Sequence, residues 1–114
     1  KTENRETIFS AEISEATKAL KIPIAHGEGN YFADIELLKE LEANRQILFR
    51  YSDEDGNVSD ENNPNGSQLN IAGIVNKNGN VMGMMPHPER ACDPTLGRTD
   101  GQQIFKSIAN YILN

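Results

Sequence analysis

Residues 71–90 read IAGIVNKNGNVMGMMPHPER, and this stretch decides the local fold. Two apolar runs, Ile71–Val75 and Val81–Met85, flank the pair Asn78-Gly79, which is the strongest short-range signal for a β-hairpin. The sequence therefore predicts two antiparallel strands joined by a tight turn. The second strand ends where a proline, a histidine, a second proline and a glutamate follow one another, so the hairpin delivers polar side chains at its exit.

The histidine and the carboxylate at this exit, His87 and Glu89, stand two residues apart. A catalytic imidazole needs a group that holds its tautomer and stabilises its charged form, and a carboxylate does both. Pro86 and Pro88 restrict the backbone on either side of the histidine and keep both side chains in fixed directions. His87 is therefore a candidate general base and acid, with Glu89 as its orienting carboxylate. The spacing alone leaves a second interpretation open, a stiff surface turn with two solvated side chains.

A base of this kind needs a nucleophile, and the only cysteine of the chain is a poor candidate. Cys92 has no neighbouring glycine, whereas a cysteine nucleophile usually lies on a strained elbow between small residues. The carboxylate of Asp93 would also repel a thiolate. A zinc site would have to combine these two residues with His26 and His87 by chance, because the cysteine pair of the zinc deaminases is missing. We therefore interpret Cys92 as a small buried or half-buried thiol, and we expect no metal.

Apolar periodicity and turn residues predict further elements. In chain order, the first are a strand at Lys21–Ala25, a loop at His26–Asn30 and a helix that Asp34 caps and Asn44 ends. A strand at Gln46–Tyr51, a polar loop at Ser52–Gln68 and a final helix follow. The caps of the final helix are expected from a capping box drawn from Thr99, Asp100, Gln102 and Gln103. On this helix one apolar stripe is formed by Ile104, Phe105, Ile108 and Ile112.

The glycine-rich loop His26-Gly27-Glu28-Gly29 is a second candidate binding element. Glycines let the main chain approach a polar ligand without obstruction by side chains. A strand-to-loop turn whose histidine is simply hydrogen-bonded remains the alternative. A phosphate-binding loop is excluded, because the loop has neither the required spacing nor the lysine.

Composition limits the class of protein. With 114 residues, the chain is one small domain or part of a larger one. A formal net charge of −6 argues against nucleic acid or an anionic membrane as the main partner. A single cysteine excludes an internal disulfide, and no apolar run approaches the roughly 20 residues that span a bilayer, so we expect a cytoplasmic protein. No methionine precedes Lys1, which indicates that the chain begins inside a longer gene product.

Several stretches together resemble one known family. They are IPIAHGEGNY at 22–31, NPNGS at 63–67, IAGI at 71–74, GMMPHPER at 83–90 and the segment Gly97–Gly101. In this order and approximate spacing, from about Asn4 onward, the chain resembles the C-terminal half of the glutaminase subunit of phosphoribosylformylglycinamidine synthase. That subunit is a class I glutamine amidotransferase of purine biosynthesis.

The resemblance implies an α/β fold, the three-layer, flavodoxin-like domain of these enzymes, of which residues 1–114 would form the C-terminal part with a β-hairpin and a C-terminal helix. It implies a Cys-His-Glu triad in which His87 and Glu89 match the family's histidine and glutamate. The cysteine and its elbow belong to the N-terminal half, which this chain lacks. In the intact enzyme the thiolate attacks the side-chain amide of L-glutamine, and the histidine protonates the departing ammonia and then activates water.

The same resemblance implies partners. The glycine-rich loop with His26, Gly27, Glu28 and Gly29 would lie beside the glutamine pocket or the synthetase interface. Ammonia would pass to a separate synthetase subunit that uses ATP and magnesium, so no cofactor is expected in this chain. A small accessory subunit would also belong to the complex.

Half of a layered domain should also expose apolar faces, so we expect pairing with the missing N-terminal half or self-association. This segment alone should be inactive. Two alternatives stay open: a glutaminase that feeds another biosynthetic synthetase, and a truncated, non-catalytic module that docks on the synthetase.

Overall fold

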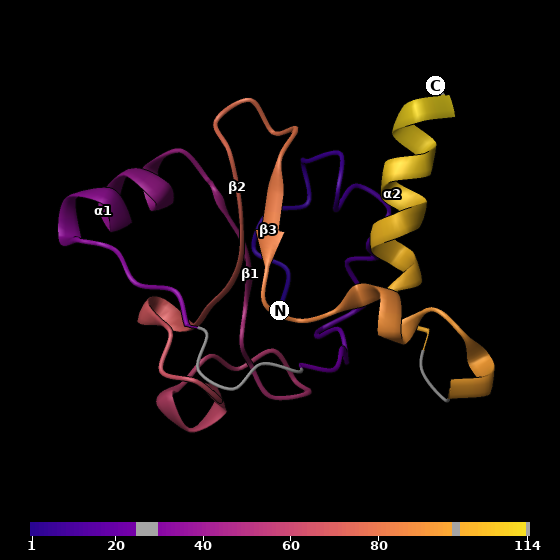
Figure 1. Ribbon diagram of the computed structural model, residues 1–114, viewed down its shortest axis with the longest axis horizontal. Helices are drawn as coiled ribbons and strands as arrows, with labels where there is room; N and C mark the ends of the chain where they lie inside the picture. The colour runs from indigo at the N-terminus through magenta and orange to yellow at the C-terminus, as the bar shows by residue number, and fades with distance from the viewer. Residues whose placement is uncertain (25–29, 97–98, 114) are drawn as a thin grey trace.

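The computed structural model describes residues 1–24, 30–96 and 99–113. Its helices and strands are α1 (Ile35–Ala43), β1 (Ile47–Arg50), β2 (Ile71–Val75), β3 (Met82–Met84) and α2 (Gln102–Leu113), with short 3₁₀ turns η1 (Asp60–Asn62), η2 (Gln68–Asn70), η3 (Pro88–Ala91) and η4 (Pro94–Leu96). The strands form an antiparallel sheet in the order β1-β2-β3, with α1 on one side and α2 on the other (Figure 1). The expected α/β architecture with a hairpin and a C-terminal helix is therefore confirmed.

The hairpin is present, and its second strand is shorter than the sequence predicts. Gly79 adopts a positive φ of 74° in the turn and donates its amide to the carbonyl of Asn76 at 3.0 Å. The side-chain oxygen of Asn76 accepts the amides of Asn80 and Val81 at 2.9 and 3.0 Å. Because a side chain in the turn takes the amide of Val81, regular pairing with β2 begins only at Met82.

Helix α1 begins and ends where the sequence predicts. The carboxylate of Asp34 accepts the amide of Leu37 at 2.8 Å, which satisfies one of the free donors in the first turn. The amide of Asn44 closes the last turn on the carbonyl of Glu40. On the inner face Leu41 is buried in a small cluster with Ile47 and Ile71, so α1 is held against the sheet.

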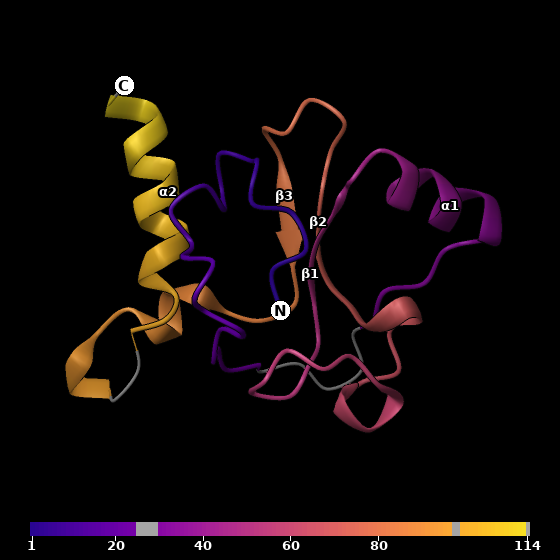
Figure 2. The ribbon, with the colours of Figure 1, turned by 180° about the vertical axis from the view of Figure 1, so that it is seen from behind.

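The main core lies between the sheet and α2. An irregular N-terminal segment runs between these two layers, as both views show (Figures 1 and 2). Its Phe9 and Ile13 pack with Ile104 of α2 and with core residues of the sheet. Buried hydroxyls hold this irregular backbone in place: Ser107 accepts the amide of Glu12 at 2.9 Å. Hydrogen bonds from side chains thus replace the ladder that a strand would supply.

The predicted apolar stripe of the final helix is only partly used. Ile104 has no solvent exposure, and Ile108 packs against the core from its edge. Phe105 and Ile112, by contrast, are 43% and 73% exposed, and Tyr111 and Leu113 are exposed beside them. The core of this chain therefore covers Ile104 and part of Ile108, and the other two side chains of the stripe are exposed.

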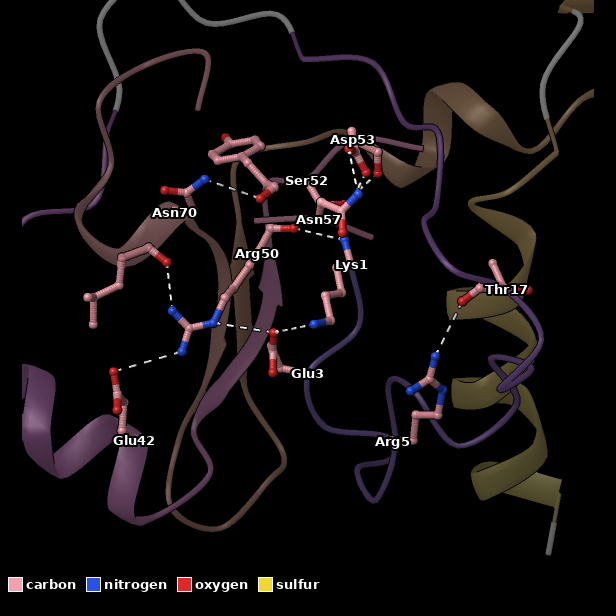
Figure 3. Close-up of polar contacts among 12 residues, drawn as sticks. Lys1, Glu3, Arg5, Thr17, Glu42, Arg50, Ser52, Asp53, Asn57 and Asn70 are labelled. Carbon is pink, nitrogen blue, oxygen red and sulfur yellow. Dashed lines mark hydrogen bonds and ion pairs between the residues drawn. The ribbon is translucent and has the colours of Figure 1, made fainter. Parts of the chain in front are cut away.

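The outer edge of β1 is covered by the first residues of the chain. The amide of Glu3 bonds to the carbonyl of Leu48, and that of Arg50 to the carbonyl of Lys1, both at 2.9 Å. The guanidinium of Arg50 donates to the carbonyl of Leu69 at 2.7 Å and forms ion pairs with Glu3 and Glu42 (Figure 3). Arg50 thereby ties the N-terminal edge segment, α1 and η2 to the sheet.

The strand predicted at Lys21–Ala25 is not formed in its described part, residues 21–24. Pro23 has no amide hydrogen, so it cannot complete a ladder of paired donors and acceptors. Its carbonyl makes a single backbone contact instead, accepting the amide of His87 at 2.8 Å. In the described parts of the chain, no helix is long and apolar enough to cross a membrane.

Candidate active site

His87 and Glu89 contact each other at the exit of the hairpin. His87 is the residue before the 3₁₀ turn η3, and Glu89 lies in the turn itself. Their side chains meet with 2.7 Å between Nδ1 of His87 and Oε1 of Glu89. The side chains are 35% and 57% exposed, so both remain accessible to a reactant from solvent.

The electrostatics of this contact define the tautomer. The hydrogen bond from His87 lowers the pKa of the Glu89 carboxyl below its ordinary value of 4.5, and the charges of His87 and Arg90 act in the same direction. The carboxylate is therefore ionised at neutral pH, where it can only accept hydrogen bonds. Nδ1 of His87 must then carry the hydrogen of this contact, and in a neutral imidazole Nε2 is the nitrogen whose lone pair can take a proton.

The backbone of the turn is held at several points. Besides the bond from the amide of His87 to the carbonyl of Pro23, the amide of Arg90 donates to the carbonyl of His87 at 3.0 Å. The thiol of Cys92 donates to the carbonyl of Pro88 at 3.1 Å. This thiol is half-buried and free of any disulfide, as predicted from the sequence, and its contact is with the turn's backbone.

The start of α2 lies directly against η3. The amide of Gly101 donates to the carbonyl of Ala91 at 2.9 Å, and the side chain of Gln102 donates to the carbonyl of Cys92 at 2.5 Å. Gln103 accepts the amide of Ser14. The predicted capping box is therefore wrong, because both glutamines make tertiary contacts instead of reaching back to a capping residue.

The glycine-rich loop lies outside the described residues, so His26, Gly27, Glu28 and Gly29 are not placed. Its flanks are placed. On the entry side Pro23 contacts His87, and on the exit side the amide of Tyr31 donates to the hydroxyl of Ser67 at 3.1 Å. The structure thus brings the flanks of the loop to the His87 turn and to the NPNGS segment, although these motifs lie far apart in sequence.

A cavity of about 360 Å³ opens beside this junction. Near the turn its lining includes Ile24 and Pro86, and elsewhere it includes Tyr51 and Pro64. Burial raises the pKa of Tyr51 above its ordinary value of 10.0, so this side chain offers a neutral hydroxyl. Within residues 1–24, 30–96 and 99–113, no group of three or more His, Cys, Asp or Glu side chains could hold a metal ion.

A family model, the CobB/CobQ-like glutamine amidotransferase domain, matches residues 1–112. The chain belongs to this glutamine amidotransferase family. It is 58% identical over 99 residues to the phosphoribosylformylglycinamidine synthase subunit PurQ of Acaryochloris marina. The aligned residues make up 87% of this chain and 42% of that protein. It is 53% identical to PurQ of Moorella thermoacetica over 97% of the chain and 47% of that protein.

The fold agrees with this glutamine amidotransferase assignment. A chain in the structure of PurLQS from Thermotoga maritima matches with a TM-score of 0.72 and 38% identity, over 97% of this chain and 44% of that one. The present chain therefore spans less than half the length of the relatives that it matches. The resemblance inferred from the HGEGNY, NPNGS and MMPHPER motifs is confirmed at the level of the family.

Sequence reasoning missed the residues that support the backbone of the turn carrying His87 and Glu89. Pro23, Asp100 and Gly101 were assigned to a strand, a helix cap and a motif of the resemblance, and none was connected to His87. One signal was available in the sequence. Gly101 occupies the start of a helix, where a residue with a capping side chain is usual, and a glycine at such a position can indicate that another backbone segment lies close to it.

Proposed function

We propose that this chain is the C-terminal part of the glutaminase subunit of phosphoribosylformylglycinamidine synthase and supplies two of its three catalytic residues. The observation that supports this most directly is the 2.7 Å contact between His87 and Glu89 on a turn with several backbone anchors. Relatives that are 53–58% identical and carry the PurQ name supply the reaction class.

In this proposal Nε2 of His87 takes the proton of a cysteine thiol that approaches from outside the chain. The resulting thiolate attacks the carboxamide carbon of glutamine, and His87 returns the proton to the departing nitrogen, which leaves as ammonia. His87 then deprotonates water for hydrolysis of the thioester, and glutamate is released. Glu89 accepts from Nδ1 throughout and stabilises the imidazolium that forms in each proton transfer.

Cys92 does not serve as the nucleophile in this mechanism. Its thiol donates to the Pro88 carbonyl, so it helps to hold the turn that carries the base. No glycine flanks it, so its surroundings differ from a nucleophile elbow with exposed sulfur. The nucleophile and its elbow would belong to the N-terminal half of the subunit, as in the resemblance.

The proposed partners are L-glutamine, the synthetase subunit and a small accessory subunit. ATP and magnesium would act in the synthetase reaction that converts formylglycinamide ribonucleotide to the amidine, and this chain would hold no cofactor. The exposed apolar side chains of α2, among them Ile112 and Leu113, favour coverage by the N-terminal half or by a second copy. A place in purine synthesis favours the cytoplasm.

Reconstitution tests the proposal. The complete gene product, combined with its synthetase, should form glutamate and the amidine, and His87→Gln should lower the glutaminase kcat by at least about 100-fold. Cys92→Ser, the matched control at the other candidate side chain, should stay within about threefold of the parent, because a hydroxyl can also donate to Pro88. Hydrolysis of glutamine by this 114-residue chain alone, abolished by Cys92→Ser, would overturn the proposal. Transfer of ammonia to another acceptor would assign the chain to a different synthetase.

A further inference from the structure

We propose that Asp100 and Gly101, at the start of α2, are positioning residues for the His87–Glu89 pair. They lie just before the helix, on a segment that carries neither side chain of the pair, and they hold the backbone at His87 and at Pro88. The inference rests on the proposed glutaminase function and adds to it the reason why the pair is held in one geometry.

Gly101 is required by the space available. A Cβ atom built on Gly101 would lie 2.1 Å from the carbonyl oxygen of Pro88, 2.8 Å from its carbonyl carbon and 3.0 Å from its Cα. These atoms are backbone, so they cannot rotate away as the end of a flexible side chain would. The φ of Gly101 is not positive, so an unusual backbone conformation does not explain the glycine. The close approach of two backbone segments of this chain explains it.

Pro88 links the two residues of the proposed catalytic pair, so a change in the contact between Gly101 and Pro88 would move the pair. It lies between His87 and Glu89, and its carbonyl also accepts the thiol of Cys92. To relieve a 2.1 Å clash, Pro88 or the segment with Gly101 would have to shift by at least about 1.3 Å to reach ordinary contact. A shift of that size is enough to break a 2.7 Å hydrogen bond between the neighbouring side chains.

Asp100 acts through a second segment, residues 21–23. Its carboxylate accepts the amide of Lys21 at 2.7 Å. Two residues later, the carbonyl of Pro23 accepts the amide of His87 at 2.8 Å. Asp100 therefore holds the short segment that in turn holds the backbone of His87, while Gly101 supports Pro88.

The test compares four variants in the complete subunit assembled with its synthetase. Gly101→Ala should lower kcat for glutamine hydrolysis by about 10- to 100-fold and leave KM within about threefold, because a misplacement near 1 Å costs on that order in rate. Asp100→Ala should lower kcat by roughly three- to tenfold. Asp100→Asn should restore it to within about twofold of the parent, because the amide oxygen still accepts from Lys21.

Gly79→Ala is the control for a loss of stability away from the site. It strains the hairpin turn at a φ of 74°, meets no atom within 4 Å, and should leave kcat unchanged. If Gly101→Ala does not fold, the comparison of Asp100→Ala with Asp100→Asn still tests the inference. Equal kcat values for Asp100→Ala and the parent, or failure of Asp100→Asn to recover activity, would overturn the inference. A parent complex with no glutaminase activity would instead refute the proposed function.

Discussion

Shortening Glu89 by one methylene should harm glutamine hydrolysis more than removing its charge. The informative set is Glu89→Asp, which keeps the charge, Glu89→Gln, which keeps the length, and Glu89→Ala, which keeps neither. If the carboxylate acts by holding Nδ1–H of His87 through a hydrogen bond, reach matters more than charge.

The magnitudes follow from the geometry and exposure of the pair. The Nδ1–Oε1 distance is 2.7 Å, and removal of one C–C bond withdraws the oxygen by about 1.5 Å, beyond hydrogen-bond range. The prolines on either side of His87 resist a backbone shift that would restore contact. Because the Glu89 side chain is 57% exposed, water screens its charge, and the amide of a glutamine is free to turn its oxygen toward Nδ1. We expect kcat to fall by about tenfold for Gln and by about 100-fold for Asp and Ala.

Initial rates of glutamate formation, with kcat and KM determined separately, measure these losses in the assembled enzyme. KM should change little, since Glu89 acts through the imidazole and is not proposed to touch glutamine. An aspartate variant with nearly full activity beside an inactive glutamine variant would refute the reasoning from reach. Parental activity in all three variants would remove any orienting role for Glu89.

Three further predictions concern pH and stability. The hydrogen bond from His87 lowers the pKa of the Glu89 carboxyl, so the contact between these side chains should persist at pH 4.5 and be lost only as the pH falls through the lowered pKa. A ¹³C NMR titration of the Glu89 carboxyl with a midpoint at or above pH 4.5 would contradict this. Ile104→Ala should reduce the free energy of unfolding by about 2–5 kcal/mol and Ile112→Ala by less than about 0.5 kcal/mol, and equal losses in urea denaturation would disprove the assigned core. Gly73→Ala, whose new Cβ would lie 2.9 Å from a phenylalanine ring carbon of β1, should cost about 1–3 kcal/mol, whereas Gly83→Ala in open space should be near neutral by the same assay.

Elements specified by neighbouring residues were predicted well. The hairpin and the cap of α1 at Asp34 depend on a few adjacent residues, and both appear where the sequence places them. The pair His87 and Glu89 was also predictable, because a two-residue spacing after a strand limits how far the side chains can separate. Local geometry carried these predictions, and the structure brings the two side chains into contact.

Features that depend on contacts distant in sequence could not be predicted from it. Gln102 and Gln103 match a capping pattern, yet each finds a partner in another segment of the folded chain. The outer residues of α2, such as Ile112, follow the helical period as well as Ile104 does, but only the inner ones meet a layer of this chain. Periodicity indicates which residues share a face and says nothing about whether a partner covers all of it.

The anchors described above for the proposed catalytic pair lie within the described residues of this chain, and in the proposed function this separates preparation of the base from supply of the nucleophile. Pro23 accepts the amide of His87, Cys92 donates to the carbonyl of Pro88, and Gly101 lies close against Pro88, so none of these contacts requires a residue outside the described part. Nδ1 of His87 is committed to Glu89, and Nε2 is the nitrogen left for an incoming thiol. A cysteine carried on a separate segment therefore needs only to reach Nε2, because the tautomer and the orientation of the imidazole are already set. Positioning of this kind lowers the entropic cost of the first proton transfer, whichever polypeptide segment brings the thiol.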